Sequence, residues 1–140
     1  MNQRLLGFDF GLQRIGVAVG QTLTQTATAI DIVACNSGKP DWAHIERLIE
    51  EWQPDAFVVG YPLNMDGTEQ EMTRACERFS HRLHGRFNRP THLQDERLSS
   101  QQAEAKAQFR YNPNKKKQFV DDVAAQVILE RWLQQPSQIE

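Results

Sequence analysis

The chain has 140 residues, 39% of them hydrophobic and 24% charged, which is the composition of one globular domain with a substantial core. The net charge of −2 argues against a protein that coats nucleic acid indiscriminately. No apolar run reaches transmembrane length, and no charged and apolar leader precedes the first predicted strand. We therefore expect a cytoplasmic protein with one domain over residues 1–135 and a frayed tail over 136–140.

The segment Leu5–Val19 predicts two buried strands joined by a turn at Gly11. Its alternation places Asp9 on the same sheet face as Gly7, and we expect open space there because glycine has no side chain. An ionised carboxylate inside an apolar strand costs several kcal/mol unless a cation or hydrogen-bond donors compensate it. Asp9 therefore either binds something positive or accepts hydrogen bonds from the backbone of the following turn.

Two phosphate-site motifs overlap this segment, and both are incomplete. Asp9 to Gly11 spells the metal-binding tripeptide of protein kinases, but the glycine-rich loop, the strand lysine and the catalytic loop are missing. Gly11 and Gly16 have the spacing of a P-loop, yet Val17 and Ala18 stand where Lys and Ser or Thr are required. Protein kinases and P-loop nucleotide-binding proteins are therefore both excluded.

The middle of the chain alternates strands and helices. Ala29–Val33 predicts a third strand, followed by a turn over Asn36–Pro40 and by a helix that Asp41 caps and Pro54 stops. Apolar residues at helical spacing predict its buried stripe: Trp42, Ile45, Leu48, Ile49 and Trp52. Ala56–Gly60 is a continuous apolar run, which is typical of a strand covered on both faces and predicts a parallel neighbour.

The next loop, Gly60–Thr68, is dense in turn-forming residues and follows a strand, where α/β sheets bind ligands. Thr68–Glu71 is a capping box for a second helix, which we expect to end at Gly85. Thr91–Gln94 predicts a fifth strand, and Ser99–Gln102 can open a third helix. The two cysteines form neither a zinc pattern nor a disulfide framework and are expected in the core: Cys35 and Cys76.

Three acidic residues fall at comparable places in this order of elements. Asp9 is in the first strand, Glu96 follows the last strand, and Asp121 begins a final helix over Asp121–Leu133. Carboxylates brought together repel one another unless hard divalent cations lie between them. Mg²⁺ or Mn²⁺ is therefore the expected cofactor.

Two adjacent aspartates compete for the place on the final helix. Asp121 shares its direction with Ala124 and Ile128, whereas Asp122 shares its direction with Gln126. We prefer Asp121 as the inward acid and expect Asp122 to interact with the helix dipole at the N-terminus.

Basic side chains gather in two stretches. The first holds Arg74, Arg78, Arg82, Arg86, Arg89, His81, His84 and His92. The second is predicted as a loop and holds Arg110, Lys115, Lys116 and Lys117. These residues can contact phosphates, although a solvated helix face and a charged loop explain each stretch equally well.

Four segments in order now resemble one family: Phe8–Ala18, Val59–Glu69, Asp95–Ser99 and Val120–Leu129. Each segment is modest alone, but together they are highly specific. They resemble the YqgF family, also called RuvX, bacterial relatives of Holliday-junction resolvases that are assigned as nucleases of precursor small-subunit ribosomal RNA. The resemblance covers most of the chain. It implies an α/β, ribonuclease H-like fold with a mixed five-stranded central sheet flanked by helices.

The resemblance also implies catalytic, metal-binding roles for Asp9, Glu96 and Asp121 in hydrolysis of a phosphodiester. Two cations about 3.5 to 4 Å apart would activate a water and stabilise the leaving oxygen, with Asp9 bridging them. Asp95 would be a fourth ligand or an orienting residue. Six residues are candidates for binding substrate, with Lys116 or Arg97 at the scissile phosphate: Arg14, Asn64, Arg97, Lys115, Lys116 and Lys117.

The function so implied is 5′-end maturation of precursor 16S rRNA. Resolution of branched DNA is an alternative, because metal ligands act on the phosphate and read no bases. A non-catalytic nucleic-acid-binding module of the ribosome or transcription machinery is another. A phosphotransferase of the actin and sugar-kinase type is disfavoured, because it encloses its nucleotide between two domains and 140 residues supply one. Expected partners are the rRNA precursor or branched DNA and the ribosome, with no membrane, for a monomer or weak homodimer.

Overall fold

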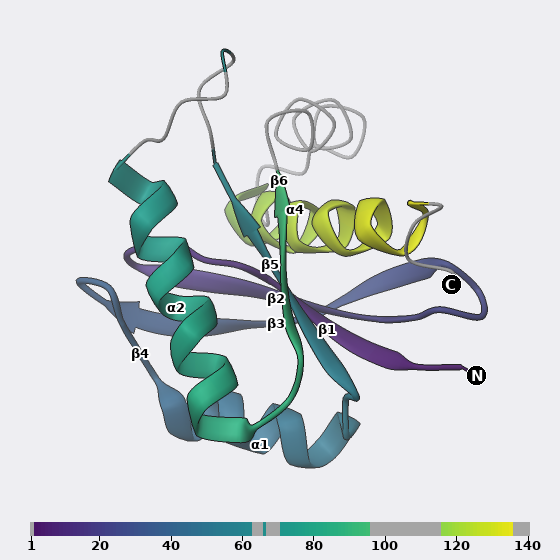
Figure 1. The fold of residues 1–140 in the computed structure, drawn as a ribbon. Coiled ribbons are helices and arrows are strands. Elements are labelled where there is room, and N and C mark those ends of the chain that lie inside the picture. The colour runs from purple at the N-terminus through teal and green to yellow at the C-terminus, as the bar shows by residue number, and fades with distance from the viewer. Residues whose placement is uncertain (1, 63–65, 67–70, 96–115, 136–140) are drawn as a thin grey trace.

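The computed structural model describes residues 2–62, 66, 71–95 and 116–135, with the backbone alone for 116–122. This part of the chain forms a six-stranded sheet of order β4-β3-β2-β1-β5-β6 (Figure 1). The strands are β1 (Arg4–Asp9), β2 (Arg14–Gln21), β3 (Thr26–Asn36), β4 (Lys39–Pro40), β5 (Ala56–Tyr61) and β6 (Thr91–Asp95). Helices α1 (Trp42–Trp52) and α2 (Glu71–Phe87) cover one face, and α4 (Lys116–Leu133) covers the other. No helix in these ranges is long and apolar enough to span a membrane.

β1 lies in the middle of the sheet because it pairs along both edges. It is antiparallel to β2, with Asp9 opposite Gly16, and parallel to β5, with Phe8 opposite Val59. β5 is in turn parallel to β6. The predicted opening hairpin and the predicted parallel neighbour are therefore confirmed, and the carboxyl ends of β1, β5 and β6 lie at one edge of the sheet.

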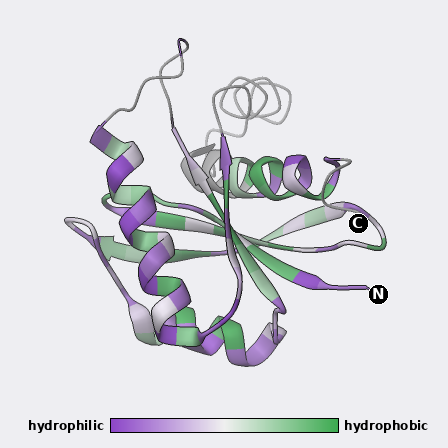
Figure 2. Cartoon of the chain, viewed as in Figure 1, coloured by the Kyte–Doolittle hydropathy of each residue, from purple (hydrophilic) through white to green (hydrophobic). Residues whose placement is uncertain are grey.

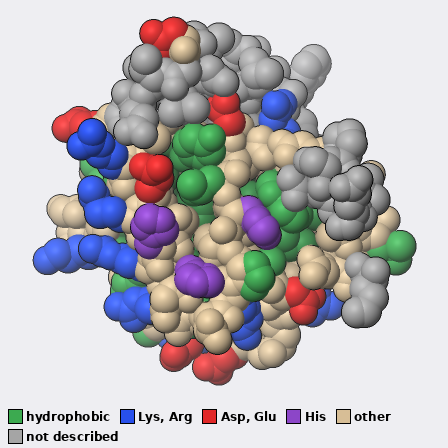
Figure 3. All heavy atoms as spheres, in the orientation of Figure 1, with side chains coloured by type: hydrophobic (Ala, Val, Ile, Leu, Met, Phe, Trp, Pro, Cys, Tyr) green, Lys and Arg blue, Asp and Glu red, His purple; other side chains and the backbone are tan. Residues whose placement is uncertain are grey.

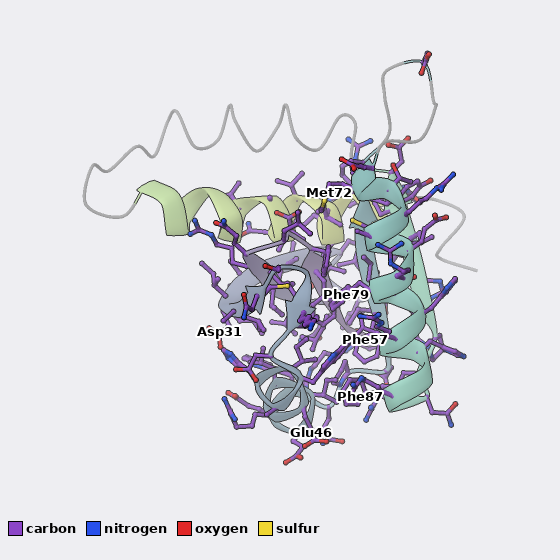
Figure 4. The ribbon with its side chains drawn as sticks, turned by 90° about the vertical axis from the view of Figure 1, so that its left-hand side faces the viewer. Asp31, Glu46, Phe57, Met72, Phe79 and Phe87 are labelled. Carbon is purple, nitrogen blue, oxygen red and sulfur yellow. The ribbon has the colours of Figure 1, made fainter. Side chains whose placement is uncertain are left out.

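The alternation along β1 sends its side chains into two cores. Leu6 and Phe8 face the core with α1 and α2, whereas Leu5 faces α4. The Phe8 ring meets the edges of Phe57 and Phe79, with centroids 5.8 and 5.5 Å away. Figure 2 shows hydrophobic residues concentrated along the strands, and Figure 4 shows Phe57 and Phe79 between the sheet and α2. By the same alternation, Asp9 belongs to the α4 face.

The first helix begins and ends as its sequence predicts. The Asp41 carboxylate accepts a hydrogen bond from the backbone N–H of His44 at 3.2 Å, and Gln53 closes the helix in a left-handed conformation. Ile45, Leu48 and Ile49 are buried, and both tryptophans of α1 pack against the core, as predicted. Both cysteines are buried in the core, as predicted.

Two predictions in the middle of the chain are wrong in detail. The sheet has six strands instead of five, because the predicted turn over Asn36–Pro40 folds back so that Lys39–Pro40 pairs with the end of β3. Gly38 makes this reversal with φ of 83°. The second helix continues past Gly85 to Phe87, because Asn88 and not Gly85 takes the left-handed conformation that closes it, with φ of 54°.

The final helix begins at Lys116 and not at Asp121. Lys116 and Lys117 are therefore helical, and the prediction that they belong to a loop is wrong. Asp122 lies beyond the first turn of α4, so the expected interaction with the helix dipole at the N-terminus does not apply. The predicted third helix, starting at Ser99, falls outside the described residues.

The open space predicted beside Asp9 at Gly7 is filled by α4. A Cβ built on Gly7 would lie 2.8 Å from the Cβ of Leu129. Glycine at this position therefore allows a helix to approach the sheet closely instead of leaving a hole. The space next to Asp9 lies on its other side, toward the β1–β2 turn.

Candidate active site

Asp9 is the last residue of β1 and is half-buried. The turn that follows is tight, since a Cβ at Gly11 would lie 2.7 Å from the carbonyl oxygen of Arg14. Two backbone hydrogen bonds tie this turn to the β3–β4 hairpin: the N–H of Cys35 donates to Gln13 O and that of Gly38 to Leu12 O, each at 3.0 Å. The turn that follows Asp9 is therefore held against the β3–β4 hairpin.

A hollow of about 460 Å³ opens beside Asp9. Its lining comes from the end of β1, the turn, the start of β2 and the first turn of α2: Asp9, Gly11, Leu12, Gln13, Arg14, Gly16 and Met72. Arg14, predicted to bind substrate, thus lies in the same hollow as the predicted metal ligand. Figure 4 shows Met72 at the end of α2 that faces this edge of the sheet.

The sequence predicts Met72 only as part of the buried stripe of the second helix and not as a residue of the site. In the structure Met72 also lines the hollow beside Asp9, because α2 begins beside the turn after β1, a contact between segments far apart in the chain. The sequence also contains no signal for the buried hydrogen bond of Gln94. Its side chain is 5% exposed and accepts a hydrogen bond from Gln135 Nε2 at 2.7 Å, which ties the end of β6 to the segment after α4.

The end of β6 lies at the same edge of the sheet as Asp9. Asp95 is half-buried, closes β6 and lies opposite Tyr61, the last residue of β5. Glu96 follows directly in the sequence but falls outside the described residues, as do Asn64, Arg97 and Lys115. The roles predicted for these residues remain predictions.

The packing of α4 indicates the direction in which Asp121 and Asp122 lie. A Cβ at Gly20, opposite Leu5 in the sheet, would lie 2.8 Å from Leu133, and Gly7 meets Leu129 in the same way. Moving one helical turn back along α4, from Leu133 to Leu129, therefore moves the contact two residues along β1, from the level of Leu5 to Gly7 and toward Asp9.

Both aspartates precede Leu129, which contacts Gly7, by about two turns of α4. Asp121 stands four residues before the fully buried Ala125, and Asp122 stands three residues before it. Their side chains lie outside the described part of the structure, so the preference for Asp121 stays a prediction. Among the described residues, no three His, Cys, Asp or Glu side chains form a metal site.

The titratable groups near the turn include a thiol. Burial raises the pKa of Cys35, and a hydrogen bond with the backbone of Gly38 offsets this only partly. A thiol held neutral is a poor nucleophile. Cys35 therefore acts as a small core residue, as predicted.

His92 of β6 is half-buried against α4. The ring of His92 stacks on Trp132 of α4 with centroids 4.7 Å apart, and burial lowers its pKa. The lowered pKa disfavours a positive charge on this ring, so His92 is less suited to contact a phosphate than the arginines of the same stretch. Its predicted phosphate contact stays a prediction.

The arrangement of strands and helices defines a resolvase-like α/β fold. The structure of the fowlpox virus resolvase with Holliday-junction DNA matches with a TM-score of 0.60 at 14% identity, over 98% of this chain and 99% of that chain. The RuvC of Thermus thermophilus in complex with a Holliday-junction substrate matches with a TM-score of 0.53 at 14% identity, over 94% and 93%. These likenesses confirm the ribonuclease H-like fold predicted from sequence.

The family follows from sequence comparison. The model of the RuvX family, described as Holliday junction resolvase, matches residues 3–135. A Hydrogenovibrio crunogenus protein is 53% identical over 129 residues, 92% of each chain, and a Pseudomonas putida protein is 47% identical over 138 residues, 93% and 94%. Both carry the provisional name pre-16S rRNA nuclease. The chain belongs to the RuvX family, and the resemblance stated from its motifs is confirmed.

Proposed function

We propose that this protein is a metal-dependent nuclease that hydrolyses phosphodiester bonds in precursor 16S rRNA. One observation carries the proposal: Asp9 ends the central strand of a resolvase-like sheet and lines an open hollow together with Arg14. A carboxylate and a guanidinium in one hollow suit a site that must hold cations and an anionic phosphate together. The provisional name of the relatives from Hydrogenovibrio and Pseudomonas supports the choice of precursor 16S rRNA.

Asp9, Glu96 and Asp121 are the proposed ligands of Mg²⁺ or Mn²⁺. Carboxylate oxygens are the donors that such hard cations prefer. The half-buried Asp9 and Asp95, at the ends of two parallel strands, fit an acidic site at this edge of the sheet. Bound divalent cations would supply an activated water and stabilise charge on the leaving oxygen.

The residues of the chain have separate tasks in this proposal. Asp9 holds charge at the end of a strand whose backbone is fixed on both edges, so its carboxylate is positioned before substrate binds. Arg14 binds a phosphate next to the cleaved bond. Asp95 orients its neighbour Glu96 or adds an oxygen of its own. Asn64, Arg97 and the lysines at 115–117 are proposed to hold the rest of the substrate.

Branched DNA is the second candidate substrate. The fold match to two resolvases whose structures contain Holliday junctions favours it. A non-catalytic module that binds RNA or the ribosome is the third candidate. In the favoured reading the protein works in the cytoplasm, as a monomer or a weak homodimer, with the ribosome among its partners.

The three candidates differ in what purified protein does to labelled substrates. We would incubate the protein with precursor 16S rRNA and with a four-way DNA junction, each with Mg²⁺, Mn²⁺ or EDTA, and include Asp9→Asn as the control. Metal-dependent cleavage of the rRNA that the control lacks supports the proposal. Cleavage of the junction alone supports the resolvase, and binding without cleavage of either substrate supports the non-catalytic module.

A further inference from the structure

A second hollow, of about 260 Å³, lies between α2 and the β3–β4 hairpin. Its floor is apolar and is formed by Phe10, Pro40 and Phe79. Its rim is basic, with Lys39 on the hairpin side and Arg78 and Arg82 on the helix side. We call this hollow the basic groove.

The charge of the basic groove has one sign. None of its lining residues is acidic, and the side chains of Lys39, Arg78 and Arg82 are all exposed. Arg78 and Arg82 are four residues apart on α2, so they share one side of the helix. Figure 3 shows Lys and Arg side chains along the side of the molecule where α2 lies. Arg86, one turn further, instead stacks over Trp42 at 4.3 Å and belongs to the packing of α1 against α2.

Leu12 connects the basic groove to the hollow beside Asp9. It lines both hollows and is 51% exposed, and its carbonyl accepts the hydrogen bond from the Gly38 N–H that ties the β1–β2 turn to the β3–β4 hairpin. From Met72 in the first hollow to Arg82 in the second, α2 rises about 15 Å. One path therefore leads from Asp9 over Leu12 and along α2.

We propose that the basic groove holds a single-stranded segment of the nucleic-acid substrate next to the cleaved bond, an inference that rests on the proposed function. An apolar floor between basic rims suits one strand, whose bases and sugars lie on the floor while its phosphates reach the rims. A hollow of about 260 Å³ is slightly smaller than an ordinary small-molecule pocket, so it accommodates a short piece of one strand and not a duplex. The exposed Leu12 contacts the base between the two hollows.

The test measures binding without cleavage. In an Asp9→Asn background with EDTA, the affinity for a fluorescein-labelled single-stranded RNA is measured by anisotropy over a salt series. The variants are Arg78→Ala with Arg82→Ala, and Lys39→Ala alone on the opposite rim. Arg47→Ala, an exposed arginine of α1 outside the groove, is the matched control. Thermal melting checks that every variant folds.

We expect the double arginine variant to bind about tenfold more weakly at 0.1 M salt and its slope of log K against log salt to fall by about 1.4, or 0.7 for each lost phosphate contact. Lys39→Ala should lower the slope by about half as much, and Arg47→Ala should leave it unchanged. A slope equal to wild type in both groove variants overturns the proposal and makes the rim a solvated face. The two proposals can fail separately. If wild type cleaves RNA but the groove variants keep the wild-type slope, only the proposed role of the basic groove is contradicted. If the slopes fall but wild type cleaves nothing, only the nuclease assignment is contradicted.

Discussion

Leu129 of α4 packs directly on Gly7 of β1, at a spacing that leaves no room for a Cβ on the glycine. This contact sets how closely α4 lies against the sheet. It also fixes which turn of α4 passes the carboxyl end of β1, where Asp9 lies two residues beyond Gly7. The position of the final helix relative to the proposed catalytic aspartate therefore depends on a residue with no side chain.

Gly7→Ala should destabilise the protein by about 1–3 kcal/mol, the usual cost of adding a methyl group to a packed core. It should also lower cleavage, because α4 must shift away from the sheet. Gly85→Ala is the matched control, since its new Cβ meets no neighbour, and it should stabilise the helix by about 0.5–1 kcal/mol. Urea unfolding of both variants measures the difference. Equal stability for Gly7→Ala and wild type would show that α4 can move without cost.

The two aspartates of α4 can be separated by substitution. Because we expect Asp121 to hold metal, Asp121→Asn should lose metal-dependent cleavage, while Asp122→Asn should keep most of it. Mn²⁺ titration by calorimetry on both variants measures the ligand role directly. If Asp122→Asn loses Mn²⁺ binding and Asp121→Asn retains it, the ligand is Asp122 and the helical register assumed from sequence is off by one residue.

The lysines at 115–117 provide a separate test of substrate binding. Replacing all three by Ala should lower the salt slope of binding to single-stranded RNA by about 0.7 for each lysine that contacts a phosphate. Alanine favours helix, so the start of α4 at Lys116 should survive the change. Circular dichroism confirms the helix content, and an unchanged slope would mean that these lysines are only solvated.

The stack of His92 on Trp132 predicts a pH dependence of stability. Burial lowers the pKa of His92 below its ordinary value of 6.5, so the unfolded state binds the proton more readily than the folded state. The contribution of His92 to the free energy of unfolding is therefore complete above pH 6.5 and is lost as the pH falls below this value toward the pKa of the folded state. His92→Phe should therefore lose less stability than wild type between pH 7 and pH 5, whereas His81→Gln on the exposed side of α2 should behave as wild type. Equal acid sensitivity in His92→Phe and wild type would contradict the lowered pKa of the half-buried ring.

Local patterns predicted the parts of the fold that depend on neighbouring residues. The hairpin after Asp9, the cap at Asp41 and the buried run after Pro54 were all readable because period, capping and turn chemistry act within a few positions. The start of α4 was misplaced because a run of lysines was interpreted as a loop, although Lys is a good helix former.

Contacts between distant segments could not be predicted in the same way. The alternation showed that Gly7 and Asp9 share a face, but only the packing of α4 shows that Leu129 fills the space at Gly7. Met72 and Arg14 meet in one hollow because α2 begins beside the β1–β2 turn, and no spacing in the sequence encodes that proximity. Asp9 was found from sequence because a charge in an apolar strand is conspicuous on its own.

The most direct test of the proposed function is the rate at which Asp9→Asn cleaves labelled precursor 16S rRNA in Mg²⁺, compared with wild type. Asparagine is nearly the same size but lacks the charge that would hold cations, so the variant should fold, bind RNA and fail to cut. Thermal melting and RNA binding without metal confirm the first two properties. Cleavage by Asp9→Asn at the wild-type rate would contradict the account, because Asp9 would then be a turn residue and not a metal ligand.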